Sequence, residues 1–115
     1  MSELTPNSVV QGLLALGREL AELSKALDRI EMDATNARED YTLAHARAFL
    51  SATGPVDVRR YTAIEATHTE RLAAETAEAL IRGRKRQLDS LKVRIDVGRS
   101  AAAALRAEIT LGGIH

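Results

Sequence analysis

Apolar residues in the first half of the chain recur at alternating intervals of four and three. Their mean spacing of 3.5 residues, kept over about six heptads, is typical of a helix that packs along one stripe in a coiled coil. Thr5 before Pro6 suits the start of such a helix, because Pro at the first helical position loses no needed N–H. The pattern predicts one helix over about residues 7–51. The series is Val9, Leu13, Leu16, Leu20, Leu23, Leu27, Ile30, Ala34, Ala37, Tyr41, Ala44 and Ala48.

The segment 52–57 is the one turn that the sequence predicts. Gly54 can adopt a positive φ at the end of a helix, and Pro55 cannot continue that helix. Asp57 is a candidate N-cap for the next helix, because its carboxylate can accept a hydrogen bond from the first free backbone N–H groups.

A second series with the same spacing follows the turn. Gly112 and Gly113 end the pattern, which predicts a continuous helix over about residues 57–110. Between Val58 and Thr76 the apolar pattern is thinner, and the expected inward positions there are Tyr61, Ile64, His68 and Leu72. The series is Ala77, Ile81, Arg84, Leu88, Leu91, Ile95, Gly98, Ala102, Leu105 and Ile109.

Two long helices joined by a short turn pack antiparallel. The expected fold is therefore all-α: a long antiparallel helical hairpin with coiled-coil-like heptads, forming a single domain over residues 1–115. The residues on its inward stripes, called the seam below, supply the hairpin and oligomer core. The core residues are Leu13, Leu16, Leu20, Leu23, Leu27, Ile30, Leu88, Leu91, Ile95, Leu105 and Ile109.

A two-helix hairpin covers only one stripe of each helix, so apolar residues off the seam are expected to be exposed. Exposed apolar patches often mark a partner surface, and we expect a homo-oligomer. The pattern permits either a hairpin closed on itself or helices swapped between subunits. The off-seam residues are Leu14, Leu43, Leu50, Leu80, Val93 and Val97.

Composition excludes several classes of protein. Apolar residues make up 45% of the chain but aromatic residues only 3%, so Ala and Leu carry the core. The absence of Cys excludes disulfide frameworks, thiolate metal sites and thiol catalysis. No stretch approaches 18 consecutive apolar residues, and no charged leader precedes an apolar run. We expect no membrane association and a cytoplasmic location.

The charge balance is neutral in total but uneven along the chain. The chain has sixteen basic and sixteen acidic residues, yet residues 82–106 contain eight basic residues and only two acidic ones. Such clusters attract phosphate backbones, which makes Arg82, Arg84, Lys85 and Arg86 candidate nucleic-acid contacts. The alternative is that these cations are solvated, or pair with acidic residues of the first helix or of another subunit.

All three aromatic residues lie within 21 residues around the turn. Arg47, Arg59 and Arg60 lie among them, and rings beside guanidinium groups resemble a platform for single-stranded nucleic acid. The alternative is that the rings only plug the end of an alanine-packed helix pair. That interpretation fits Tyr41 and Phe49 better, whereas Tyr61, Arg59 and Arg60 are the better candidates for contact.

Catalytic and metal-binding patterns are poor. His45, His68 and His115 are the only histidines, and His115 is expected to be disordered as a terminal residue. Glu65 and His68 have the Glu-x-x-His spacing of metal sites in helix bundles, but the first helix supplies no partner motif. We expect no enzyme activity, no cofactor and no metal.

Two stretches carry a resemblance to a known family. The stretch from Tyr41 to Arg60, YTLAHARAFLSATGPVDVRR, leads into a polar helix that closes with LDSLKVRIDVGRS from Leu88 to Ser100 and LRAE from Leu105 to Glu108. Together they resemble small helical proteins of tailed phages that are similar to UvsY-like recombination mediators. The resemblance covers roughly residues 35–109.

The resemblance implies a ring-forming homo-oligomer that binds single-stranded DNA. Such mediators help a recombinase displace single-strand-binding protein and load on the strand. The residues that match the basic contacts of this family are Arg47, Arg59, Arg60, Arg82, Arg84, Lys85 and Arg86. The segment 33–40 is acidic where the family has a Lys-rich stretch. A structural or protein–protein adaptor, without a nucleic-acid role, is the alternative function.

Overall fold

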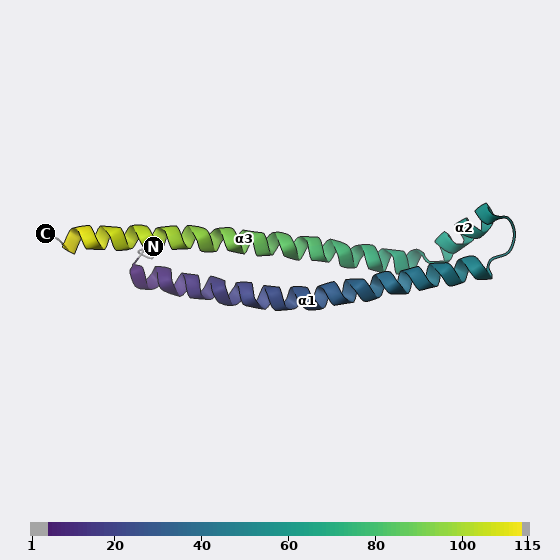
Figure 1. Cartoon of the computed structure of the whole chain (residues 1–115), viewed down its shortest axis with the longest axis horizontal. Coiled ribbons are helices and arrows are strands. Elements are labelled where there is room, and N and C mark those ends of the chain that lie inside the picture. Colours follow the sequence, from purple (N-terminus) through teal and green to yellow (C-terminus); the bar gives the residue numbers. More distant parts are fainter. Residues whose placement is uncertain (1–4, 114–115) are drawn as a thin grey trace. The chain divides into compact units, whose positions relative to one another are not determined.

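A computed structural model describes residues 5–113, and this part of the chain is all-helical. Helix α1 spans Pro6–Ser51, α2 spans Val56–Ala66 and α3 spans His68–Gly113 (Figure 1). The prediction of an all-α fold with long helices is confirmed. The described residues form two compact units: a terminal unit of residues 5–25 and 85–113, and a turn unit of residues 26–84.

In the terminal unit, the start of α1 and the end of α3 run side by side in opposite directions (Figure 1). Thr5 caps α1 as predicted. The Ser8 N–H donates to Thr5 Oγ1 at 3.0 Å, and the Thr5 N–H donates to Ser8 Oγ at 2.9 Å. This reciprocal arrangement satisfies backbone N–H groups that the first helical turn leaves without a partner.

Leucine and other large aliphatic residues form the seam of the terminal unit. Val9 and Leu91 are buried, and the other seam residues there are half-buried. Gly98 allows a close approach, because a Cβ atom added at this position would lie 2.7 Å from Cδ2 of Leu13. Leu13 therefore packs over Gly98, directly against the α3 backbone.

Ile109 does not belong to this seam. It was expected inward, but its side chain is 56% exposed. Pro6, the first residue of α1, shares a groove with Ala102 and Arg106 of α3. Because α1 begins at that level, no residue of α1 lies opposite the later position 109.

Small residues form most of the seam of the turn unit, although Leu27 is also buried there. Ala34 and Ala74 are buried, and Ala63 and Thr67 have almost no exposed surface. Residues 63, 67, 70 and 74 extend the four-and-three spacing backwards from Ala77. The expected inward positions, Tyr61, Ile64, His68 and Leu72, are all exposed, so that register is wrong. Packing selects the small residues because they let two helices approach closely.

The turn holds Gly54 at φ 104°, the positive value that the sequence predicts. Pro55, not Asp57, is the N-cap of α2, and no side chain caps this helix. Asp57 lies in the first turn of α2, where its carboxylate faces Arg60 at 3.5 Å. A carboxylate in the first turn still favours the helix through the helix dipole.

The helix after the turn is interrupted at Thr67, where the sequence predicts a continuous helix. Thr67 has φ −114° and ψ 19°, and its Oγ1 donates to the Ala63 carbonyl at 2.7 Å. The Thr67 N–H donates to the same carbonyl at 3.1 Å. A threonine hydroxyl that competes for the carbonyl four residues earlier favours a bend in a helix. Thr35, Thr62 and Thr110 form the same kind of bond inside unbroken helices, so the bond at Thr67 accompanies the separation of α2 from α3 but does not by itself account for it.

Apolar residues off the seam are exposed, as expected. Those named from the sequence have between 44% and 74% of their surface exposed. Val10, Val56, Val58 and Leu111 join this exposed set.

Candidate nucleic-acid interface

The basic run of α3 divides into outward and seam residues. Arg82, Lys85 and Arg86 are exposed, whereas Arg84 is half-buried on the seam between Ile81 and Leu88. Lys85 and Arg84 each already take part in an interaction with another residue. Arg82 and Arg86 are therefore the members of this run best placed for a phosphate.

A second feature of α3 is a row of cations that sequence reasoning did not single out. Lys85, Lys92, Arg99 and Arg106 follow one another at intervals of seven residues, and all four are exposed. Seven residues are nearly two helical turns, so these side chains share one side of α3 at intervals of about 10 Å. We call them the basic row. The sequence contained the signal, because four of the eight basic residues between positions 82 and 106 are spaced seven residues apart.

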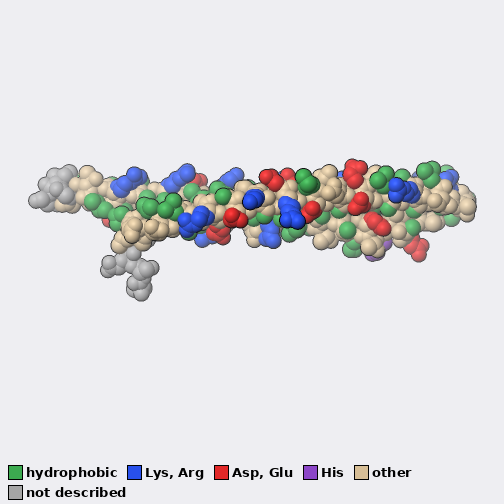
Figure 2. Space-filling model, turned by 90° about the horizontal axis from the view of Figure 1, so that it is seen from below, with side chains coloured by type: hydrophobic (Ala, Val, Ile, Leu, Met, Phe, Trp, Pro, Cys, Tyr) green, Lys and Arg blue, Asp and Glu red, His purple; other side chains and the backbone are tan. Residues whose placement is uncertain are grey.

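Few carboxylates neutralise this row. Asp96 lies 3.9 Å from Arg99, but both side chains are about three-quarters exposed, so the pair contributes little. Among the described residues, no ion pair involves Arg82, Arg86, Lys92, Arg94 or Arg106. Figure 2 shows basic side chains spread along the drawn face with acidic side chains between them, so the cations on this face do not form one continuous patch.

Arg99 and Arg106 also border a shallow groove of the terminal unit. Its remaining lining residues are Pro6, Val10, Leu13 and Ala102, and its volume is about 280 Å³. The groove therefore combines an apolar floor with two guanidinium groups at its edge. Such a surface can hold an anion next to an apolar face of the same molecule.

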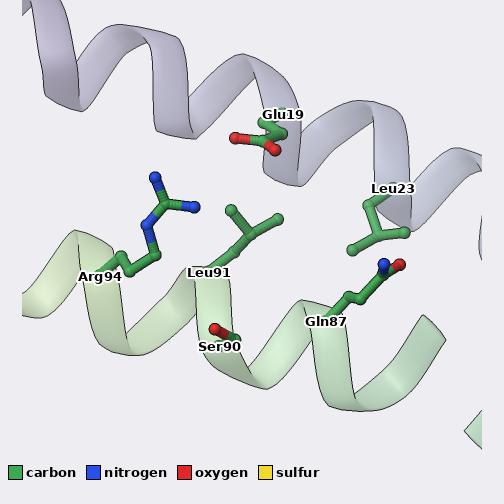
Figure 3. A pocket seen from close by; sticks show the side chains of 6 residues that line it. All are labelled: Glu19, Leu23, Gln87, Ser90, Leu91 and Arg94. Atoms are coloured by element: carbon green, nitrogen blue, oxygen red, sulfur yellow. The ribbon is translucent and has the colours of Figure 1, made fainter. Parts of the chain in front are cut away.

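A second groove of the terminal unit lies between Glu19 and Arg94 (Figure 3). Leu23, Gln87, Ser90 and Leu91 complete its lining, and its volume is about 270 Å³. The Glu19 carboxylate and the Arg94 guanidinium both point toward the space between the helices, but no ion pair joins them. The acidic residue makes this groove a poorer place for phosphate than the basic row.

The candidates near the turn are arranged differently from one another. Arg59 is half-buried, with its guanidinium carbon 4.7 Å from the centre of the Phe49 ring. This cation–π contact holds Arg59 against α1. Arg60 lies near Asp57, and Arg47 is exposed. Tyr61 is 70% exposed, so its ring is accessible for stacking even though it does not lie on the seam.

The remaining rings and histidines form structural contacts. Tyr41 and His45 meet edge to face, with ring centres 6.0 Å apart. His68 Nδ1 lies 3.1 Å from Arg71 Nη2. Arg71 also forms an ion pair with Glu75, one turn later in α3. No group of three His, Asp or Glu side chains within residues 5–113 could hold a metal ion. His115 lies outside the described residues.

The chain matches no protein-family model, no curated protein and no solved structure. None of the helices within the described range is long and apolar enough to cross a membrane.

Proposed function

We propose that this chain binds single-stranded DNA without base specificity, as an oligomer, in the manner of a phage-type recombination mediator. The observation that supports this proposal most is the concentration of exposed cations on α3, five of which lack an ion pair within the described residues. In such a role the protein assists a recombinase to load on a strand covered by single-strand-binding protein. It acts in the cytoplasm, which is the host's if a phage encodes it.

The mechanism is electrostatic. Lys and Arg side chains of α3 neutralise phosphates and release condensed counterions, so affinity falls with rising salt. The basic row presents one cation at every second helical turn, which suits a flexible strand that follows the helix. Tyr61 can stack on a base without selecting its identity. Assembly of several chains multiplies these weak contacts into a stronger interaction.

A salt titration of fluorescence anisotropy, with a labelled single-stranded oligonucleotide, tests the basic row. The variant K92A/R99A/R106A removes three exposed cations and should lower the slope of log K against log salt by about 2. The matched control R18A/K25A/R29A removes three exposed cations from α1 and should leave the slope nearly unchanged. Equal effects of the two variants, or no effect of either, would overturn the assignment to α3.

A second pair of variants tests the run 82–86. R82A/R86A should weaken binding, because both side chains are exposed and form no ion pair with a described residue. R84A should instead lower stability, because Arg84 lies on the seam. Thermal unfolding followed by circular dichroism separates these two effects.

An adaptor that binds another protein is the second candidate. The observation that favours it is the set of exposed apolar residues near the turn, where Leu50 is 74% exposed and Val56 is 56% exposed. Exposed apolar surface of this kind is costly unless a partner covers it. Absence of DNA binding at low salt, combined with retained self-association, would favour this second function.

A further inference from the structure

The outward side of α3 in the terminal unit carries a second heptad series. Seven uncharged residues follow at alternating intervals of three and four, and all are exposed: Ser90, Val93, Val97, Ser100, Ala104, Ala107 and Leu111. Each of the first six lies two residues after a seam residue, which corresponds to about 200° around the helix. This series, called the outer stripe, therefore lies mainly on the side of α3 away from α1, and only Ser90 at its start also lines a groove with α1.

The composition of the outer stripe is not that of a solvated face. Seven charged residues occur between positions 89 and 108, and none of them falls on the stripe. Val93, Val97 and Leu111 are each more than 60% exposed. An uncharged heptad repeat sustained over three heptads is the pattern of a second helix-packing seam.

We propose that the outer stripe is a homodimer interface, in which the α3 helices of two copies pack antiparallel. The two-fold axis passes near residue 102. In this register Val93 packs against Leu111 of the second copy, and Val97 packs against Ala107. Ser100 and Ala104 meet at the centre, where small side chains let the helices approach closely.

Charge complementarity selects this arrangement. In an antiparallel pair, the residues that flank the stripe on one side meet their equivalents from the other copy. Arg94 then lies opposite Glu108 of the second copy, twice by symmetry, and Ala101 meets Ala101 on the axis. In the single chain Arg94 points into the groove that it shares with Glu19, but neither Arg94 nor Glu108 forms an ion pair with another described residue, so in the dimer the Arg94 side chain turns from that groove to Glu108 of the second copy. The second copy supplies the partner that each of them lacks.

The interface is independent of the basic row. The dimer leaves the cations Lys92, Arg99 and Arg106 exposed. They do not flank the outer stripe directly, because each lies one helical position beyond the flanking residues. The inference deepens the self-association part of the proposed function. The experiments below contain no DNA, so failure of DNA binding and failure of the dimer are read separately.

Sedimentation equilibrium of the full chain over the micromolar range tests the interface. The expected result is a concentration-dependent rise from the 12.5 kDa of one chain toward twice that mass. Val97→Glu places a carboxylate within the stripe and should weaken the dimer at least tenfold, because burial of an unpaired charge is costly. Val58→Glu is the control: Val58 is also exposed, but in α2. A monomer at all concentrations, or equal effects of both variants, would overturn the proposal.

Charge exchange tests the antiparallel register. Arg94→Glu and Glu108→Arg should each weaken the dimer about fivefold, because each places like charges opposite one another. The double variant R94E/E108R should restore the original affinity. In a parallel dimer residue 94 would instead lie near Asp89 of the other copy, so R94E would be rescued by D89R. Rescue by D89R and not by E108R would contradict the proposed pairing.

Discussion

The two units of the molecule bury their seams in opposite ways. The terminal unit has large aliphatic residues there, yet most of them stay half-buried, and only Val9 and Leu91 fall below a tenth exposed. The turn unit has mainly small residues on its seam, and Ala34, Ala63 and Thr67 are almost completely buried. Most large side chains of the terminal seam therefore keep an edge in water, whereas the small residues of the turn seam are covered by their neighbours.

We infer from this difference that the two units owe their stability to different kinds of packing. In the terminal unit we expect stability to depend on apolar area, which a truncation removes. In the turn unit we expect it to depend on close fit, which an enlargement destroys. Substitutions of opposite kind therefore separate the two units, if unfolding is measured at one fixed protein concentration, because association also changes apparent stability.

The largest effect is expected for Leu91→Ala in the terminal unit. Leu91 is 5% exposed, and its truncation should lower the free energy of unfolding by about 2–3 kcal/mol. Leu14→Ala is the control, since Leu14 is half exposed and should change stability by less than about 1 kcal/mol. Urea unfolding followed by circular dichroism measures both. Similar losses for the two variants would show that burial on this seam is not what stabilises the unit.

The next effect is expected for Ala63→Leu in the turn unit. Ala63 has no exposed surface, so the added atoms must push α2 away from its neighbours, at a cost of about 1–3 kcal/mol. Ala73→Leu makes the same chemical change at an exposed position and should be nearly neutral. If Ala63→Leu stabilised the protein, close packing of small residues would not describe this unit.

A pair of glycine substitutions gives a smaller difference. Gly17→Ala should raise the free energy of unfolding by about 0.5–1 kcal/mol, because a Cβ there meets nothing within 4 Å and alanine favours the helix. Gly98→Ala should gain clearly less, because its Cβ would displace the end of the Leu13 side chain. Thermal unfolding of both variants reports the difference. Equal gains would mean that Leu13 moves aside at no cost.

The smallest effect on stability is expected for Thr67→Val. The carbonyl of Ala63 keeps the Thr67 N–H as a donor, so loss of the hydroxyl should cost less than about 1 kcal/mol. The local conformation should change more than stability does. Backbone chemical shifts at residues 66–68 should move toward helical values, and unchanged shifts would show that the hydroxyl does not cause the break.

Sequence periodicity predicts the terminal seam well because leucine and isoleucine mark its positions. It fails between residues 58 and 76, where the larger apolar side chains are not the buried ones. Tyr61, Ile64 and Leu72 are the larger apolar residues there, yet Ala63 and Ala74 face the neighbouring helix. Continuation of the three-and-four spacing from Ala77 would have given the right register without regard to hydrophobicity.

Other features depend on interactions that residue types alone do not specify. The break at Thr67 is not specified by threonine itself, because Thr35, Thr62 and Thr110 form the same hydrogen bond to the carbonyl four residues earlier without a break. The contact between Arg59 and Phe49 needs α2 to return against α1. The basic row and the outer stripe, by contrast, are repeats that can be read from the sequence once the seam has been fixed.

The seam residues of α1 alternate at intervals of three and four without a break, so the same seam position recurs every seven residues. Removing a single residue would rotate every later side chain by about 100° and turn the seam away from its partner. Removing seven residues keeps the rotation and only shortens the helix. An internal deletion in the terminal unit therefore keeps the seam in register only if it removes whole heptads, taken together from α1 and α3. Internal deletions that preserve the fold are expected to remove multiples of fourteen residues.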